Sequence, residues 1–194
     1  MFILSLYWLL SPILWILLPV FAIFTPKLRH HWANQKSTWH LAGERKKENG
    51  VGKQVVLFHA ASTGEFEQLK PILKKVNRSR YFILLTFFSP TIFNIEKNTP
   101  LADAVCYHPF DFPWSALLFF RKFDIHHYII TRNDIWPTHL FIAKQLGINT
   151  ILINANLYRE RHYNSRFMMF FLKQIFDNFN LILTGSERLQ SNLL

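Results

Sequence analysis

From residue 54 onward the chain alternates between short apolar runs and amphipathic segments, and this alternation restricts the possible folds more than any other feature. Strands of a parallel sheet are buried on both faces, so their sequences are continuous apolar runs. The helices between such strands carry an apolar stripe with a period of 3.6 residues. Strands are expected at Val55–His59, Tyr81–Thr86, Ala104–His108, His127–Thr131, Thr150–Asn154 and Leu181–Thr184.

Helical patterns fill the intervals between these runs. Helices are expected at Phe66–Val76, Thr91–Lys97, Pro113–Phe123, Trp136–Leu146 and Ser165–Asn178, with a further helix start at Ser186. A regular strand–helix order predicts an α/β domain, in which right-handed crossovers place helices on both faces of a parallel sheet. Residues 54–194 are therefore expected to form one doubly wound domain.

The first 24 residues contain no charged side chain. As a helix they would measure about 36 Å, which is enough to cross the hydrocarbon core of a bilayer. Pro12 and Pro19 would kink such a helix, and membrane helices tolerate these kinks. Residues 1–24 are thus expected to form a membrane anchor helix that either spans the bilayer or lies in its interface.

The segment that follows, residues 25–53, is strongly basic. Against Glu44 and Glu48 it holds seven basic residues, a net of +5 out of +10 for the whole chain: Lys27, Arg29, Lys36, Arg45, Lys46, Lys47 and Lys53. We interpret it as a basic juxtamembrane segment and linker. By the positive-inside rule this flank places the remainder of the chain in the cytoplasm.

A formal charge of +10 favours an anionic partner, which is a membrane surface, a phosphorylated substrate or nucleic acid. Because much of the charge lies beside the apolar run and no DNA- or RNA-binding motif is present, we expect membrane lipids and no nucleic acid. The histidines do not combine with cysteine or acidic residues at metal-ligand spacing, so no metal site is expected. Cys106, the only cysteine, is predicted to be a buried strand thiol.

The first predicted strand ends in His59 and leads into Ser62-Thr63-Gly64-Glu65. One interpretation is structural: Ser or Thr caps the next helix, and a glutamate in the first turn meets the positive end of the helix dipole. The other is functional, since open α/β sheets bind ligands at the carboxyl ends of their strands. There Glu65 would be an ionised general base, and Gly64 would let a ligand approach the backbone.

Polar residues also follow the other predicted strands, at the same edge of the sheet. Ser89, Pro90 and Thr91 follow the second strand and Asp111 follows the third, where turns and helix caps are an equally good explanation. A polar cluster from Arg132 to Trp136, which includes Asp134, follows the fourth strand, and Arg132 is suited to an anionic group. Asn154 begins a further polar segment whose Arg159 and Arg161 suit phosphate or carboxylate, or simply face solvent.

Taken in order, these motifs resemble the amino-terminal half of the Kdo transferases, which attach 3-deoxy-D-manno-octulosonic acid (Kdo) to lipid A. The resemblance spans the whole chain and includes the apolar helix with its basic flank. Its six motifs are His59–Glu65, Ser89–Thr91, Pro109–Pro113, Asp134–Pro137, Asn154–Leu157 and Thr184–Glu187.

The resemblance implies a GT-B glycosyltransferase, in which two Rossmann-like domains face each other across a cleft. The first domain of such enzymes binds the lipid A precursor and the second binds CMP-Kdo, with no further cofactor. This chain would be the first, acceptor-binding domain at the cytoplasmic face of the inner membrane. Without a carboxyl-terminal donor domain it is expected to be inactive alone.

The resemblance also implies roles for individual residues. Glu65 would be the general base that deprotonates the acceptor hydroxyl in an inverting transfer of Kdo. The residues expected to bind substrate are Ser62, Thr63, Gly64, Ser89, Pro90, Thr91, Asp111, Arg132, Asp134, Trp136 and Asn154.

The chain departs from the family pattern at two places in the expected acceptor site. Where the family commonly has Glu-x-Glu-Leu-Trp-Pro, residues 132–137 read Arg-Asn-Asp-Ile-Trp-Pro, and the family's Asn-Ala-Arg becomes Asn-Ala-Asn at residues 154–156. Two alternatives to a Kdo transferase therefore stand beside it. One is another GT-B transferase that uses a nucleotide sugar, and the other is a membrane-tethered α/β module that binds anionic lipid without catalysis.

Overall fold

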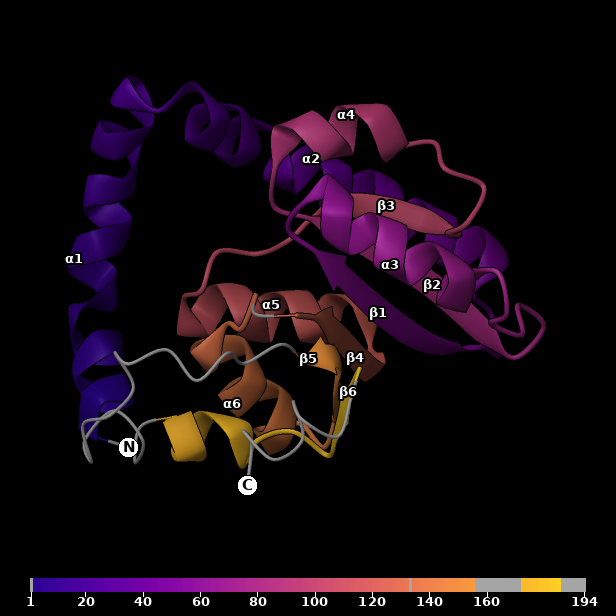
Figure 1. The fold of residues 1–194 in the computed structure, drawn as a ribbon. Helices are drawn as coiled ribbons and strands as arrows, with labels where there is room; N and C mark the ends of the chain where they lie inside the picture. Colours follow the sequence, from indigo (N-terminus) through magenta and orange to yellow (C-terminus); the bar gives the residue numbers. More distant parts are fainter. Residues whose placement is uncertain (1, 133, 156–171, 186–194) are drawn as a thin grey trace.

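The protein folds around one six-stranded sheet in a computed structural model that describes residues 2–132, 134–155 and 172–185 (Figure 1). All neighbouring strands are parallel, and their order is β3-β2-β1-β4-β5-β6. The strands are β1 (Gln54–Ala60), β2 (Tyr81–Phe87), β3 (Ala104–Tyr107), β4 (Ile125–Thr131), β5 (Asn149–Ala155) and β6 (Leu181–Thr184). The predicted α/β class and the Rossmann-like parallel sheet are confirmed, and the apolar amino-terminal helix precedes them.

Helices alternate with the strands as the sequence pattern predicts. They are α1 (Phe2–Phe24), α2 (Pro26–Asn49), α3 (Thr63–Leu73), α4 (Pro90–Glu96), α5 (Pro113–Phe123) and α6 (Pro137–Gln145). Helices α2, α4, α5 and α6 each begin with proline, whose fixed φ suits a first helical position where no N–H bond is lost. Residues 172–176 are also helical; the rest of the expected helix at 165–178 and the one from Ser186 lie largely outside the described residues.

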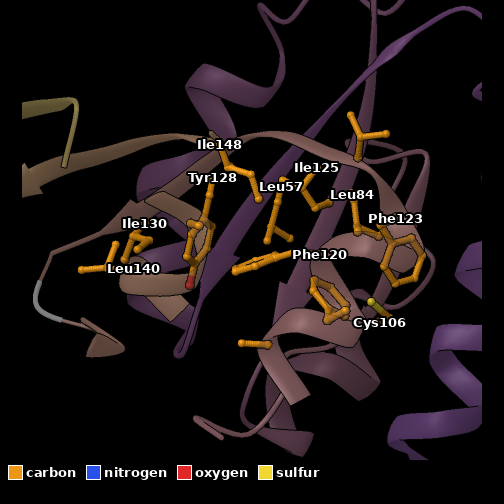
Figure 2. Close-up of a cluster of buried hydrophobic side chains, with 14 of the residues drawn as sticks. Leu57, Leu84, Cys106, Phe120, Phe123, Ile125, Tyr128, Ile130, Leu140 and Ile148 are labelled. Atoms are coloured by element: carbon orange, nitrogen blue, oxygen red, sulfur yellow. The ribbon is translucent and has the colours of Figure 1, made fainter. Parts of the chain in front are cut away.

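Side chains of alternating direction along the central strands form one apolar layer on each face of the sheet. Leu57 and Leu84 pack with α5 and α6 on one face, where Phe120 and Phe123 fill the space between sheet and helices (Figure 2). The strand residues that alternate with Leu57 and Leu84, such as Phe58, pack with α3 and α4 on the other face of the sheet. Cys106 lies in the first of these layers, and burial raises the pKa of its thiol.

Helix α2 covers the edge of the sheet, a role that the basic composition of residues 25–53 did not indicate. The indole of Trp39 donates to the carbonyl oxygen of Tyr107 in β3 (2.8 Å), and the Tyr107 N–H donates to the hydroxyl of Thr38 (3.3 Å). An edge strand otherwise presents unpaired backbone groups, so α2 satisfies them with its side chains. Its buried residues recur at helical spacing and are mostly polar: His31, Gln35, Thr38 and Ala42.

Helix α1 stands along one side of the domain (Figure 1). It contacts the domain through a few residues: the Trp8 indole donates to the Thr138 hydroxyl (3.1 Å), and the Trp15 ring lies 4.5 Å from that of Trp32. Most of its other large apolar side chains are exposed, Leu9 and Ile16 by 74% and 72%. By length and composition α1 qualifies as a membrane-spanning helix.

Candidate functional site

The candidate site lies where the strand order reverses. Strand β1 pairs with β2 on one side and with β4 on the other, so the connections from β1 and β4 run in opposite directions across the sheet. Ligands of open α/β sheets bind at the carboxyl ends of the strands at such a switch point. The two segments that leave this point are Ser62–Glu65 after β1 and Arg132–Trp136 after β4. The topology therefore brings together the two densest of the predicted polar motifs.

Glu65 and Ser62 form a capping box at the start of α3. The Ser62 hydroxyl accepts from the Glu65 N–H (3.4 Å), while Oε2 of Glu65 accepts from the N–H groups of Ala61 (2.6 Å) and Ser62 (3.2 Å). The structural interpretation of this motif is thus correct in detail. It leaves Oε1 of Glu65 without a hydrogen-bond partner among the described residues, on a side chain that is half-buried and belongs to no ion pair described there.

The residues around Glu65 leave its surroundings open. Ser62, Thr63 and Gly64 are all exposed. A side-chain carbon added at Gly64 would meet no other atom within 4 Å, so packing in the described part of the chain does not require glycine there. The first turn of α3 is accessible to a ligand.

Asp134 is held by two side chains from different elements. Its Oδ2 lies 2.6 Å from Nε2 of His59, the penultimate residue of β1, and accepts from the Trp136 indole at 3.0 Å. The carboxylate is 23% exposed, whereas the His59 ring is completely buried. Burial by itself raises the pKa of Asp134, but the hydrogen bond and charge of His59, with the Trp136 hydrogen bond, outweigh it and lower the pKa.

Behind Asp134 lies a buried cluster of histidines. His59 Nδ1 is 3.1 Å from the Thr86 hydroxyl, which is 3.0 Å from His108 Nδ1. His108 Nε2 in turn is 2.9 Å from His139 Nδ1 and 3.0 Å from the Tyr128 hydroxyl. Burial first, and then the charges of neighbouring histidines, lower the pKa of His108 well below its ordinary value. Burial also lowers the pKa of His139, to about 3.

Arg132 and Asn154 share an unusual backbone conformation at neighbouring strand ends. Their φ angles are 59° and 52°, in the left-handed region that costs most residues energy. The Arg132 N–H donates to the Ile153 carbonyl (2.9 Å), and the Asn154 amide donates to Gln68 (3.2 Å) in α3. Side chains held in such conformations at a ligand-binding edge are candidates for binding.

The remaining predicted site residues lie after β2 and β3, at or near the starts of the helices that follow. Asp111 accepts from the His139 N–H at the start of α6 (3.2 Å), and burial raises its pKa to about 7 although hydrogen bonds from His139 and Thr138 oppose the shift. Ser89 precedes α4 without a side-chain capping bond, Pro90 is buried as the first helical residue, and Thr91 is exposed.

Five buried polar residues of this region were not predicted as site residues: His59, Thr86, His108, Tyr128 and His139. Of these, His59 alone belongs to one of the six motifs, and the available signal was polarity at the ends of otherwise apolar strands. No group of three or more His, Cys, Asp or Glu within residues 2–132, 134–155 and 172–185 could hold a metal ion. The expected polar residues 156–161, and Ser186 and Glu187, lie outside the described residues.

Comparison with known proteins gives the same family throughout. The family model described as 3-deoxy-D-manno-octulosonic-acid transferase (kdotransferase) matches residues 31–194. The 3-deoxy-D-manno-octulosonic acid transferase of Aquifex aeolicus is 32% identical over 104 residues, which are 53% of this chain and 28% of that protein. The corresponding enzyme of Chlamydia muridarum is 29% identical over 118 residues, 59% of this chain and 27% of that protein.

A plant relative extends this set. The probable mitochondrial 3-deoxy-D-manno-octulosonic acid transferase of Arabidopsis thaliana is 26% identical over 133 residues, 66% of this chain and 30% of that protein. The chain thus spans less than a third of the length of these relatives. Because the family model covers the entire sheet, α3 to α6 and most of α2, this chain belongs to the 3-deoxy-D-manno-octulosonic acid (Kdo) transferases, a family of glycosyltransferases.

Proposed function

We propose that this chain forms the acceptor-binding part of a Kdo transferase of lipopolysaccharide biosynthesis, which transfers Kdo from CMP-Kdo to a lipid A precursor. Glu65 is the general base of this proposal. The observation that carries it is the position of Glu65: an accessible carboxylate at the topological switch point, with one oxygen fixed and the other unengaged among the described residues. Membership of the family supports the reaction class.

The proposed step is an inverting displacement. Oε1 of Glu65 accepts the proton of an acceptor sugar hydroxyl while the hydroxyl oxygen bonds to the anomeric carbon of Kdo. The bond from that carbon to the phosphate oxygen breaks at the same time, and CMP leaves with the electron pair. The N–H groups of Ala61 and Ser62 hold Oε2, so the base is oriented before the substrate arrives.

Other residues of the rim are proposed to hold the acceptor. Arg132 is suited to an anionic group of the lipid, since a guanidinium forms strong paired hydrogen bonds with phosphate. Asp134 and Asn154 present polar groups beside it, and the Trp136 ring provides an apolar wall. Ser62, Thr63, Gly64, Ser89, Pro90, Thr91 and Asp111 complete the proposed acceptor side of the site.

Donor binding is proposed to need a part of the family's length that this chain does not span, because the chain matches less than a third of its relatives. The test therefore uses a chimaera in which residues 31–194, the part that the family model matches, replace the equivalent domain of the Aquifex aeolicus relative. Transfer from CMP-Kdo to a labelled lipid A precursor is measured for the chimaera, Glu65→Gln and Glu67→Gln.

Glu67 is the matched control, because it lies on the same helix and is exposed in an ion pair with Lys70. We expect Glu65→Gln to lower the transfer rate by about 10²–10⁴-fold and Glu67→Gln to leave it nearly unchanged. Equal rates for the chimaera and Glu65→Gln, or no transfer from CMP-Kdo by a folded chimaera, would overturn the proposal. Transfer from a different nucleotide sugar would favour another GT-B activity.

We also propose that α1 attaches the protein to the cytoplasmic face of the inner membrane. Its outer surface is a continuous set of exposed Leu, Ile, Val and Phe side chains, and α2 carries exposed basic residues directly after it. Apolar burial and attraction to anionic lipid both favour attachment. Co-sedimentation with vesicles of anionic phospholipid is expected for the chain and not for Leu9→Asp/Ile16→Asp.

The control for that test places two new aspartates on the domain instead, as Asn94→Asp/Asn98→Asp at exposed positions in and after α4. It is expected to bind vesicles like the parent chain. Loss of binding in the control to the same extent would show that charge alone, rather than the apolar face of α1, decides attachment.

A further inference from the structure

Helix α1 contacts the rest of the protein through one stripe that runs along most of its length. Seven residues between positions 4 and 24 are buried or half-buried, most of them three or four residues apart: Leu4, Tyr7, Trp8, Ser11, Trp15, Leu18 and Ala22. Such spacing places side chains on a single face of a helix. From Leu4 to Ala22 the stripe measures about 27 Å. The helix therefore lies lengthwise against the protein and is not attached by one end alone.

Polar and aromatic contacts hold this stripe in place. The Tyr7 hydroxyl donates to the Asp111 carbonyl (2.7 Å), and the Trp8 indole donates to the Thr138 hydroxyl (3.1 Å). The ring of Trp15 lies 4.5–6.0 Å from three aromatic rings, those of Trp32, Phe112 and Trp114. The partners belong to α2, α5, α6 and the segment after β3. A helix surrounded by lipid could not make these contacts.

The length of the stripe decides between a spanning helix and an interfacial one. If α1 spanned the bilayer, the stripe would cover almost all of the hydrocarbon core, which is about 30 Å thick. The protein side of every contact would then lie inside the core. Near the amino-terminal end of α1, Leu4 lines one hollow together with Lys144 and Asp177, and both of these charged residues are exposed. Charged side chains are costly at that depth, so α1 cannot span while it stays docked.

The other faces of α1 are exposed and consist almost entirely of apolar residues. Leu9, Ile16 and Ile23 have exposed fractions of 74%, 72% and 64%. They are seven residues apart and thus lie on nearly the same side of the helix. Directly after α1, Lys27 and Arg29 are exposed at the start of α2. An apolar face with basic residues at its end matches the surface of a bilayer that contains anionic lipid.

We propose that α1 is an in-plane anchor: it stays docked on the domain and inserts its exposed face into one leaflet of an anionic bilayer. Tyr7 and Trp8 bind the segments that follow β3 and β4, at the same edge of the sheet as Glu65. The anchor thus holds this edge beside the lipid surface, where a lipid-linked acceptor is presented. The inference rests on the proposed membrane attachment of α1, and the in-plane geometry does not depend on the proposed reaction.

Depth measurements on the 194-residue chain bound to vesicles of anionic phospholipid test the orientation. A fluorescent label is attached to Leu9→Cys, Ile16→Cys or Ile23→Cys, and quenching by lipids that carry the quencher at defined depths is measured. The native Cys106 is fully buried and stays in place, so the parent chain serves as the unlabelled blank. We expect the three labels to lie at one depth. In a spanning helix the first and last positions would differ in depth by about 21 Å, with Ile16 between them.

The control places the label at Val51→Cys, which is exposed by 81% and precedes β1 at the opposite edge of the sheet. It is expected to escape quenching by every lipid. A graded depth along α1 would overturn the proposal in favour of a spanning helix. Vesicle binding without quenching at any of the three positions would overturn it in favour of a second protein copy on this face. A chain that binds no vesicles would refute the proposed attachment as well.

Cross-linking tests whether α1 stays docked in the bilayer. The rings of Trp8 and Phe141 are in contact, with centroids 4.9 Å apart. In Trp8→Cys/Phe141→Cys, a short bifunctional maleimide is expected to join the two positions equally well in solution and on vesicles. The matched control is Leu9→Cys/Phe141→Cys, whose first position lies on the exposed face, and it is expected to lose the cross-link.

Loss of the Trp8→Cys/Phe141→Cys cross-link on vesicles would overturn the proposal, because α1 would then have left the domain. The proposed reaction is decided separately by transfer in the chimaera. If the chimaera shows no transfer while the three labels lie at one depth and the cross-link persists, the proposed reaction fails and the in-plane anchor is supported.

Discussion

The carboxylate of Glu65 accepts a 2.6 Å hydrogen bond from the backbone N–H of Ala61, four residues earlier in the chain. This contact closes the turn between β1 and α3, so the residue proposed as the base is also a helix cap. Capping boxes accept either Glu or Gln at this position, because an amide oxygen can replace the carboxylate oxygen. The two roles of Glu65 can therefore be separated by substitution.

Glu65→Gln is expected to change the free energy of unfolding by no more than about 1 kcal/mol, the contribution of one charge at a helix N-terminus. Glu65→Ala loses the acceptor as well and is expected to cost about 1 kcal/mol more. Urea unfolding of the two variants checks the difference. If Gln destabilises as much as Ala, the carboxylate makes a charge-specific contact, and a loss of activity in Glu65→Gln would no longer identify a base.

A second prediction concerns the cover of the edge strand by α2. Thr38→Val leaves the buried N–H of Tyr107 without its acceptor, which is expected to cost about 1–3 kcal/mol of unfolding free energy. The control is Ser37→Ala, on the exposed side of the same helix, where the hydroxyl bonds to the Asn34 carbonyl. It is expected to change stability by less than about 0.5 kcal/mol. Equal effects would mean that the hydroxyl of Thr38 contributes nothing to edge protection.

Helix α2 is an element whose packing could not be predicted from the sequence. The strands at the centre of the sheet could be predicted because β1 and β2 are buried on both faces, so burial determines their apolar composition. The buried face of α2 instead contains His31, Gln35 and Thr38, of which His31 and Thr38 form hydrogen bonds at the ends of β2 and β3. Because a polar buried face shows no apolar periodicity, the sequence of this segment indicates a solvated basic flank.

The local part of the candidate site could be predicted from the sequence, and its long-range contacts could not. Ser62 and Glu65 are three residues apart, so a local motif was enough to predict the cap. The contact of His59 with Asp134 joins residues 75 apart, and that with Thr86 depends on the exact pairing of β1 with β2. Such contacts depend on strand register and on the paths of loops, and neither can be deduced from amino-acid composition.

A third prediction uses the raised pKa of Asp111, about 7 in the folded protein against an ordinary value near 3.8. Between these values the folded state binds the proton and the unfolded state does not, so wild-type stability loses up to about 1.4 kcal/mol per pH unit as pH rises. Asp111→Asn removes this loss and still accepts from the His139 N–H. Its stability relative to wild type is expected to rise from pH 4 to 7 and then to level off.

Urea midpoints at intervals between pH 4 and 8 measure that profile. The control for replacing aspartate by asparagine is Asp124→Asn, at an exposed position where the left-handed backbone also suits asparagine. A constant difference between Asp111→Asn and wild type over this range would show that Asp111 does not titrate on folding.

The fourth prediction concerns the buried neutral histidines, whose effect has the opposite sign. Burial lowers the pKa of His31 to about 4 and that of His139 to about 3, and it also lowers the pKa of His108 well below the ordinary value. Below pH 6.5 the unfolded chain binds protons that the folded protein excludes, so stability falls as pH falls. The rings of His31 and His139 are each expected to cost about 2 kcal/mol at pH 5, against one opposing contribution from Asp111.

His31→Gln tests this effect on a single ring. The ring of His31 lies between the carbonyl oxygens of Phe88 (2.8 Å) and His108 (2.9 Å), and an uncharged amide can donate to either of them. The variant is expected to be less stable than wild type at pH 7.5, because it loses ring contacts, but to lose less stability between pH 7.5 and 5. A slope equal to that of wild type would mean that His31 is already protonated in the folded protein, held as a cation by its two carbonyl acceptors.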